Sequence, residues 1–327
     1  MIGIITEIEK QFVGGSQFLI PLLKDPDVTD ILINGTHSLY VDKLGEMSVY
    51  GTPVPDLQTL SQMIERMVIP TGKRIDASKP YLDGKLVDGS RFHIILPPIA
   101  RDGAIISIRK HKTLSERGTL LESFAPKEAV KLLRSMMESR SNLLIAGATG
   151  VGKTTLLCEL LQLIPASERI LVIEETLEIQ TNHPHVVHLE ARGQSPDGRG
   201  EVTLRDLIKN ALRMRPDRLI LGECRGEEVK ELLQALNTGH GGSLCTIHAN
   251  SAQEALRRLE TLLLISAPTL NVRIAREWIS HCIQGVIYLE RLKGSRQITQ
   301  ILQVQGLEGE VYRIHPRYDS FKGVNRL

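Results

Sequence analysis

The stretch Gly147–Thr155 reads GATGVGKTT and directly follows the apolar run LLIA at residues 143–146. It fits the pattern G-x-x-x-x-G-K-[ST], in which a glycine-rich loop joins a strand to the first turn of a helix. Glycine lets the backbone wrap closely around a polyphosphate, and the loop amides and the positive end of the helix attract its charge. The stretch therefore predicts a nucleotide-binding loop between a buried strand and a helix.

Single positions of this loop have expected roles in binding a nucleoside triphosphate. The ammonium group of Lys153 is expected to reach the β- and γ-phosphates, and the hydroxyl of Thr154 to ligate Mg²⁺. The loop residues expected to bind ATP are Gly147, Ala148, Thr149, Gly150, Val151, Gly152, Lys153, Thr154 and Thr155. A chance glycine-rich turn is the alternative, and four matched positions between a predicted strand and a predicted helix disfavour it.

Composition restricts the class of protein. The 327 residues are 42% hydrophobic and 24% charged, with a formal net charge of +2 and an aromatic content of 4%. This balance argues against a dedicated nucleic-acid-binding role, which favours a basic face and stacking side chains, so we expect no direct nucleic-acid partner. No apolar run approaches the ~20 residues that cross a bilayer, and the N-terminus lacks the features of a secretory signal. We therefore expect a cytoplasmic protein.

The pattern of the chain changes near residue 112. Up to that point, short strands around an Asn-Gly turn and a helix over 57–67 predict a small α/β domain at residues 1–112. Residues 113–125 are expected to form an irregular linker. From 126 to 327, strands alternate with helices, which is typical of a mainly parallel sheet with helices on its faces. The tail from 285 to 314 predicts a short β-meander.

Further strand ends of this second domain carry acidic or imidazole side chains. Ligands of open α/β sheets bind at the carboxyl ends of strands, and a triphosphate site needs acids for Mg²⁺ and water. We predict that Glu174 activates water, with Glu175 as the next candidate, and that Glu223 holds Mg²⁺ through a water molecule. His248 is predicted to sense the γ-phosphate. Taken singly, each of these residues also has an ordinary structural interpretation.

Together these motifs resemble the secretion-ATPase superfamily, which drives type II secretion, type IV pili and type IV secretion. Its marks are the phosphate loop, the acidic box VIEETLEI (172–179), the segment LRMRPDRLILGECRG (212–226) and the histidine box TGHGGSLCTIHANS (238–251). Within the superfamily, the strings DVTDILING (27–35), SIRKH (107–111), NALRMRPDR (210–218) and LQVQGLEGEVYRI (302–314) are most similar to the CpaF-type ATPases of tight-adherence pili. The acidic box departs from the usual Glu-Asp by reading Glu174-Glu175.

The resemblance implies a RecA-like P-loop NTPase domain that follows a smaller α/β N-terminal domain. It implies an ATPase that uses ATP and Mg²⁺ and works as a homo-hexamer, peripheral at the cytoplasmic face of the inner membrane. Its expected partners are the inner-membrane platform proteins of a pilus or secretion machine. The alternatives are a conjugation or type IV secretion traffic ATPase and, less favoured, a RecA-type nucleic-acid translocase.

A ring of this kind also implies an arginine that completes each site from another domain or subunit, because guanidinium groups stabilise the charge of a transferring phosphoryl group. The candidates are Arg109, Arg205, Arg213 and Arg215. For each of them a surface salt bridge is an equally good interpretation.

Overall fold

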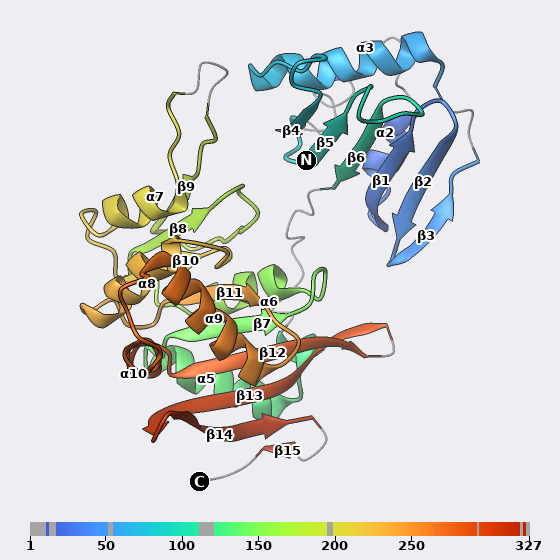
Figure 1. The fold of residues 1–327 in the computed structure, drawn as a ribbon. Helices are drawn as coiled ribbons and strands as arrows, with labels where there is room; N and C mark the ends of the chain where they lie inside the picture. The colour runs from blue at the N-terminus through green and yellow to red at the C-terminus, as the bar shows by residue number, and fades with distance from the viewer. Residues whose placement is uncertain are drawn as a thin grey trace. The chain divides into compact units, whose positions relative to one another are not determined.

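The computed structural model describes residues 11–12, 18–51, 55–110, 121–194, 199–292, 294–320 and 323–324. They divide into two compact units. The first extends from α2 (Leu19–Lys24) to β6 (Ile105–Arg109), and the second from α4 (Leu121–Phe124) to β15 (Gly323–Val324) (Figure 1). Within the described ranges, no helix is both long and apolar enough to span a membrane.

In its described part, the first unit is an antiparallel sheet of six strands with helices packed on it. The strand order is β3-β2-β1-β6-β5-β4. The strands not yet placed are β1 (Val28–Asn34), β2 (Ser38–Lys43), β3 (Glu46–Val49), β4 (Tyr81–Lys85) and β5 (Arg91–Ile95). The helix α3 (Leu57–Val68) begins after Asp56, whose carboxylate accepts a hydrogen bond from the backbone N–H of Thr59 at 2.7 Å. A turn of 3-10 helix, η1 (Ile69–Thr71), follows it.

The second unit is built on one large sheet. In the described residues it has nine strands in the order β15-β14-β13-β12-β7-β11-β10-β8-β9. Its strands are β7 (Leu143–Gly147), β8 (Ile170–Glu174), β9 (Val186–Glu190), β10 (Arg218–Leu221), β11 (Leu244–His248), β12 (Gly285–Leu292), β13 (Ser295–Glu308) and β14 (Val311–Asp319), besides β15. The strands from β12 to β9 in this order run parallel, and β13, β14 and β15 continue the sheet antiparallel. The predicted meander is therefore an extension of the main sheet.

Both faces of this sheet are covered by helices, as its sequence pattern requires. Alternate strand residues enter two separate cores: Leu144 and Ala146 of β7 face one, and Leu143 and Ile145 the other. Strands buried on both faces read as continuous apolar runs, which is what β7, β8 and β10 show. The covering helices are α5 (Lys127–Glu138), α6 (Lys153–Leu161), α7 (Leu204–Ala211), α8 (Glu228–Asn237), α9 (Ala252–Ser266) and α10 (Val272–Cys282). The predicted fold class is therefore confirmed: a mainly parallel α/β unit follows a smaller α/β unit in the sequence.

The prediction of an irregular linker is wrong for the last residues of that segment. Residues 113–125 were expected to be an irregular linker, but Leu121–Phe124 form the short helix α4. Leu121 is fully buried and Phe124 is 4% exposed, and both belong to the core that lies on the α5 and α6 side of the sheet. Burial of these two apolar side chains stabilises the folded chain, and polar side chains at the same positions would not provide this stabilisation. The preceding residues 113–120 lie outside the described part of the chain.

Candidate nucleotide-binding site

The phosphate loop adopts a conformation that depends on glycine. The backbone φ is 153° at Gly147, 73° at Gly150 and 100° at Gly152, all in a range that side-chain-bearing residues rarely adopt. A Cβ atom at Gly147 would also lie 2.6 Å from the carbonyl oxygen of Leu289 on β12. Gly152 precedes α6, and no side chain caps that helix. The first amides of α6 are therefore available to an anion.

Lys153 points its ammonium group into this loop. Its Nζ donates hydrogen bonds to the carbonyl oxygens of Gly147 at 3.0 Å and Ala148 at 2.8 Å, and the residue is 7% exposed. Burial lowers the pKa of Lys153 to about 8, which the nearby Glu223 carboxylate opposes and the Arg225 guanidinium reinforces. At neutral pH the group is therefore still mostly charged, and it is held where the phosphates of a bound nucleotide are expected.

A chain of polar contacts leads from Lys153 through the ends of two further strands. The Nζ of Lys153 lies 3.1 Å from Nδ1 of His248, and Nε2 of His248 lies 2.9 Å from Oε1 of Glu223. Arg225 then donates from Nη2 to Glu223 Oε2 at 2.6 Å and from Nη1 to Glu175 Oε2 at 2.7 Å. The predicted acid Glu223 and the predicted sensor His248 are thus brought beside the phosphate-loop lysine.

These contacts fix the protonation of His248. An ammonium group only donates hydrogen bonds, so Nδ1 accepts from Lys153 and the ring proton lies on Nε2, the atom that lies 2.9 Å from Glu223 Oε1. The pKa of His248 is lowered, first by burial and then by the charge of Lys153, which keeps the ring neutral near pH 7. If the Lys153 ammonium moved toward a phosphate, Nδ1 of His248 would lose the hydrogen bond that it accepts from Lys153.

The backbone of the neighbouring strands places this chain of contacts. β10 and β11 run parallel, with Leu221 beside Cys245, so Glu223 and His248 emerge at the same edge of the sheet. The Thr246 hydroxyl donates to the carbonyl of Gly222 at 2.6 Å, and the N–H of Cys224 donates to the carbonyl of Thr246 at 2.8 Å. These bonds hold Gly222 and Cys224, which follow β10, against β11.

Glu174 lies at the same edge in a different environment. It is the last residue of β8 and is 4% exposed. Its Oε1 accepts hydrogen bonds from the backbone N–H groups of Glu178 at 2.9 Å and Ile179 at 3.0 Å. This carboxylate braces the loop that follows β8, so its role as the base stays a prediction. Glu175, half exposed and joined to Arg225, is the alternative that the geometry brings into the chain of contacts.

The predicted arginines are not gathered around the phosphate loop within the second unit. Arg205, at the start of α7, pairs with Glu231 at 2.8 Å and Glu227 at 3.3 Å, contacts that raise its pKa. Arg213 and Arg215 are exposed after α7 and shortly before the first residue of β10, at the opposite edge of the sheet from the phosphate loop.

Arg109 ends β6 of the first unit, where its Nε lies 3.6 Å from Asp30 Oδ1. Whether Arg109, Arg205 or the exposed pair after α7 completes a site stays a prediction.

Sequence reasoning missed Arg225, which joins Glu223 to Glu175. Its position two residues after Glu223, at the end of the same apolar strand, was the available signal. It also missed Arg296, whose Cδ lies beside the phosphate loop at Gly152. No sequence signal placed Arg296 there, because it depends on which strand pairs with β12.

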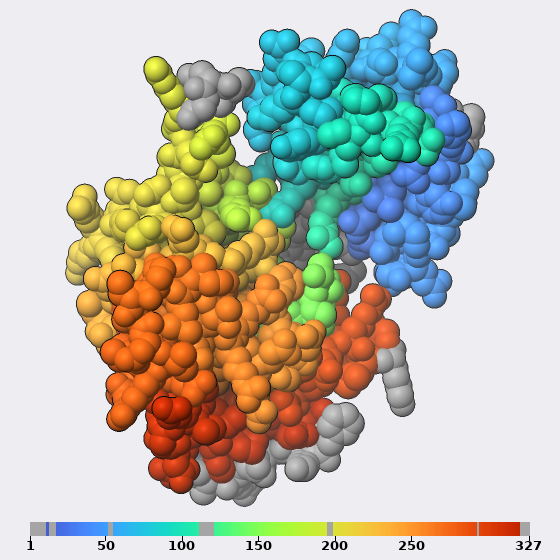
Figure 2. Space-filling view, viewed as in Figure 1, coloured from blue at the N-terminus to red at the C-terminus, as the bar shows by residue number. Residues whose placement is uncertain are grey.

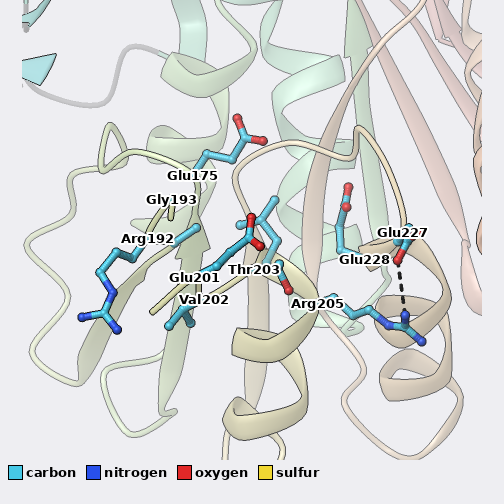
Figure 3. A pocket seen from close by; sticks show the side chains of 11 residues that line it. Glu175, Arg192, Gly193, Glu201, Val202, Thr203, Arg205, Glu227 and Glu228 are labelled. Carbon is cyan, nitrogen blue, oxygen red and sulfur yellow. Dashed lines mark hydrogen bonds and ion pairs between the residues drawn. The ribbon is translucent and has the colours of Figure 1, made fainter. Parts of the chain in front are cut away.

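A cavity of about 450 Å³ lies on the α7 side of Glu175 (Figure 3). Its charged lining is mostly acidic, with Glu175, Glu201, Glu227 and Glu228 against Arg192 and Arg205. Phosphate-loop residues are not part of its wall. An acidic cavity disfavours a triphosphate, so we place the nucleotide at the phosphate loop and not in this cavity.

The donor set suits a magnesium ion that is carried by a nucleotide. Among the described residues, no group of three or more His, Cys, Asp or Glu side chains is arranged to hold a metal ion. Mg²⁺ keeps several waters and binds proteins through one or two side chains together with substrate phosphates, so a full cage is not required. That Thr154, at the start of α6, ligates Mg²⁺ directly and that Glu223 holds it through water stay predictions.

A glycine-shaped phosphate loop, a buried lysine and acids at the ends of parallel strands define a P-loop nucleotide-binding protein with a RecA-like fold. The chain belongs to the Type II/IV secretion system protein family, which it matches over residues 13–308. The family and the site together identify it as a secretion ATPase.

Individual relatives agree with this family. A "Putative conjugal transfer protein" of Mycobacterium tuberculosis (strain H37Rv) is 33% identical over 92% of this chain and 87% of its own length. The "Type IV secretion system protein VirB11" of Brucella suis is 30% identical over 75% of this chain and 76% of its own length. The solved structure of the ATPase DotB of Legionella pneumophila shares the fold, with a TM-score of 0.63, 22% identity, and coverage of 88% of this chain and 80% of DotB.

Proposed function

We propose that this chain is a Mg²⁺-dependent motor that hydrolyses ATP to ADP and phosphate and drives assembly of a tight-adherence type IV pilus. The observation that carries the proposal is the chain of contacts from Lys153 through His248 to Glu223. It links the group expected to bind phosphate to the acid expected to act on Mg²⁺ or water. A change at the γ-phosphate would therefore alter contacts at three strand ends at once.

The residues have separable tasks in this proposal. Lys153 leaves the carbonyls of Gly147 and Ala148 to bind the phosphates, and the free amides of α6 bind them from the helix end. Bound Mg²⁺ supplies charge neutralisation on the phosphates, held by Thr154 directly and by Glu223 through water. Glu174 or Glu175 orients the attacking water and accepts its proton.

The motor is proposed to be a homo-hexamer in the cytoplasm, bound to the cytoplasmic face of the inner membrane through platform proteins of the pilus machine. Among the described residues of the second unit, Arg225 is already paired with Glu223 and Glu175, and Arg213 and Arg215 lie at the other edge of the sheet. A neighbouring domain or subunit would supply the arginine that completes the site, and a ring that closes by rotation gives every site such a neighbour.

A conjugal transfer or type IV secretion motor is the second candidate, and the names of the Mycobacterium and Brucella relatives favour it. The same catalytic site would serve either machine. A nucleic-acid translocase is a weaker rival, because the chain has an aromatic content of only 4% and a net charge of +2.

Deletion of the gene in its host, complemented with wild type or with Lys153→Ala, separates these candidates. The proposal expects loss of surface pili in the deletion strain, seen by electron microscopy, and rescue by wild type only. Intact pili together with a loss of conjugal DNA transfer would assign the motor to the second candidate. Genes for a small pilin and two polytopic membrane proteins beside this one would independently support the pilus assignment.

A further inference from the structure

A hairpin carries a pair of arginines to the edge of the phosphate loop. Leu289 of β12 lies beside Gly147, the last residue of β7. β12 continues beyond that point and turns into β13, so that Arg291 faces Arg296 across the hairpin. Figures 1 and 2 show this orange-red hairpin extending next to the green segment that contains the phosphate loop.

Arg296 is in contact with the loop itself. A Cβ atom built at Gly152 would lie 2.9 Å from Cδ of Arg296 and 3.7 Å from its Nε. Gly152 is the residue that precedes α6, next to Lys153. The stem of Arg296 therefore packs on the turn where the helix amides and the Lys153 ammonium face an anion.

The guanidinium group of Arg296 has no partner among the residues that the structure describes. Burial, and then the like charge of Arg291, lower the pKa of Arg296. Arg291, in contrast, donates from Nε to the carbonyl of Gly294 at 3.3 Å. The like charge of Arg291 raises the free energy of the Arg296 guanidinium, and a phosphate group beside Arg296 would offset that cost.

We propose that Arg296 is a second cation for the phosphate chain of the bound nucleotide, contacting it from the side of the loop opposite His248. The inference rests on the proposed nucleotide site and extends it. Arg296 belongs to the same chain as Lys153, so it binds the nucleotide before any neighbouring subunit contributes an arginine. Its planar donors suit phosphate oxygens, and the flanking helix amides complete the set.

The decisive comparison is between Arg296→Gln and Arg291→Gln, which remove the same charge from the same hairpin. Calorimetric titration would measure the affinity of each purified full-length variant for ADP and for inorganic tripolyphosphate. We expect Arg296→Gln to weaken both ligands roughly tenfold or more, as for loss of a charge-assisted hydrogen bond. Arg291→Gln should change either affinity by no more than about threefold.

A measurement on the wild-type protein covers the case in which Arg296→Gln does not fold. Phenylglyoxal modifies accessible arginines, and peptide mass spectrometry reports each site. Saturating ADP should slow modification of Arg296 severalfold and leave the rate at Arg291 unchanged. An unchanged rate at Arg296 would overturn the assignment.

The titrations have further outcomes that would overturn the assignment of Arg296, and each of them can be distinguished from the others. Wild-type affinity in Arg296→Gln, or equal weakening in both variants, would remove Arg296 from the site. A loss for ADP without a loss for tripolyphosphate would move the contact to the base or ribose. If wild type itself bound neither ligand, the proposed nucleotide site would fail, which is a different result from failure of Arg296 alone.

Discussion

Lys153 is the residue on which the nucleotide site depends most. It is 7% exposed, and its ammonium is held by two carbonyls of its own loop. Replacing it with alanine removes the charge that would balance the β- and γ-phosphates. We expect Lys153→Ala to lower steady-state ATP turnover by a factor of roughly 10³, by analogy with loss of one preorganised donor. A coupled phosphate-release assay measures it, and near-normal turnover would reject the phosphate-loop interpretation.

Glu223 should separate binding from chemistry. Glutamine at this position can still contact His248 and Arg225 but carries no charge for the Mg²⁺ shell and accepts no proton. Glu223→Gln is therefore expected to keep nucleotide affinity within a few fold and to lose kcat by roughly 10²-fold or more. Equal loss of affinity and turnover would show that Glu223 serves binding only.

Glu174 and Glu175 can be told apart in the same assay. Glutamine at 174 can still accept the N–H groups of Glu178 and Ile179, so the fold should persist while a base is lost. If Glu174 activates water, Glu174→Gln abolishes turnover and Glu175→Gln retains most of it. The reverse result would assign the base to Glu175. Normal turnover in both variants would place the base elsewhere.

At the scale of elements, a buried ion pair connects the amino end of β10 with two neighbouring segments. Arg218 is 1% exposed and donates to Glu168 from Nε at 2.6 Å and from Nη2 at 3.2 Å. Its Nη1 also donates to the carbonyl of Met137 at the end of α5, at 3.2 Å. Arg218→Met would leave Glu168 with Arg140, at 3.5 Å, and would remove the donor to the Met137 carbonyl, so we expect a loss of about 1–3 kcal/mol in the free energy of unfolding. Urea denaturation measures this loss, and a change below about 1 kcal/mol would contradict it.

The same pair predicts a dependence of stability on pH. The Arg218 hydrogen bond, opposed by burial, holds the pKa of Glu168 below its usual value of 4.5. A depressed carboxyl pKa contributes stability that is present above 4.5 and is lost as the pH falls through the folded value. Wild type should therefore lose more stability than Glu168→Gln below pH 4.5. Parallel acid profiles for the two proteins would contradict this.

How far the sequence predicts the elements depends on how local their signals are. Buried runs such as Leu219–Leu221 and the periodic helix Lys127–Glu138 could be placed because each carries its own pattern. β9 was missed because its half-buried, mixed residues form a strand by pairing with β8. α10 was missed although it carries a local signal, the capping residue Asn271 and a buried face with Ala275 and Ile279. The pairing of the tail with β12 is also non-local, which is why Arg296 escaped prediction.

The residues of the site also differ in whether a local sequence signal identifies them. The phosphate loop, Glu223 and His248 could be predicted, because a motif or a strand end identifies each of them. The contact of Glu174 with the backbone of its own loop could not, because it depends on how that loop folds back.

At the scale of the whole molecule, the proposal of a ring rests on an arginine that acts on a neighbour's site. Glu223→Gln and the double variant Arg213→Ala, Arg215→Ala should each be nearly inactive alone if one of these arginines acts in trans. Mixed in equal amounts, they should regain activity, because some sites then combine an intact acid with an intact arginine. A mixture of Lys153→Ala with Glu223→Gln is the matched control and should regain none. Without recovery in the first mixture, the same test applies to Arg109 and Arg205.

The most direct test of the central claim is the specific ATPase activity of the wild-type protein as a function of its concentration. Sedimentation velocity on the same samples would report the oligomers present. If ATP is hydrolysed at sites shared between subunits, turnover per subunit is low in dilute, monomeric samples. It should rise over the concentration range in which rings form and then level off. Full turnover by a monomer, independent of concentration, would contradict the account and leave an ATPase that is complete within one chain.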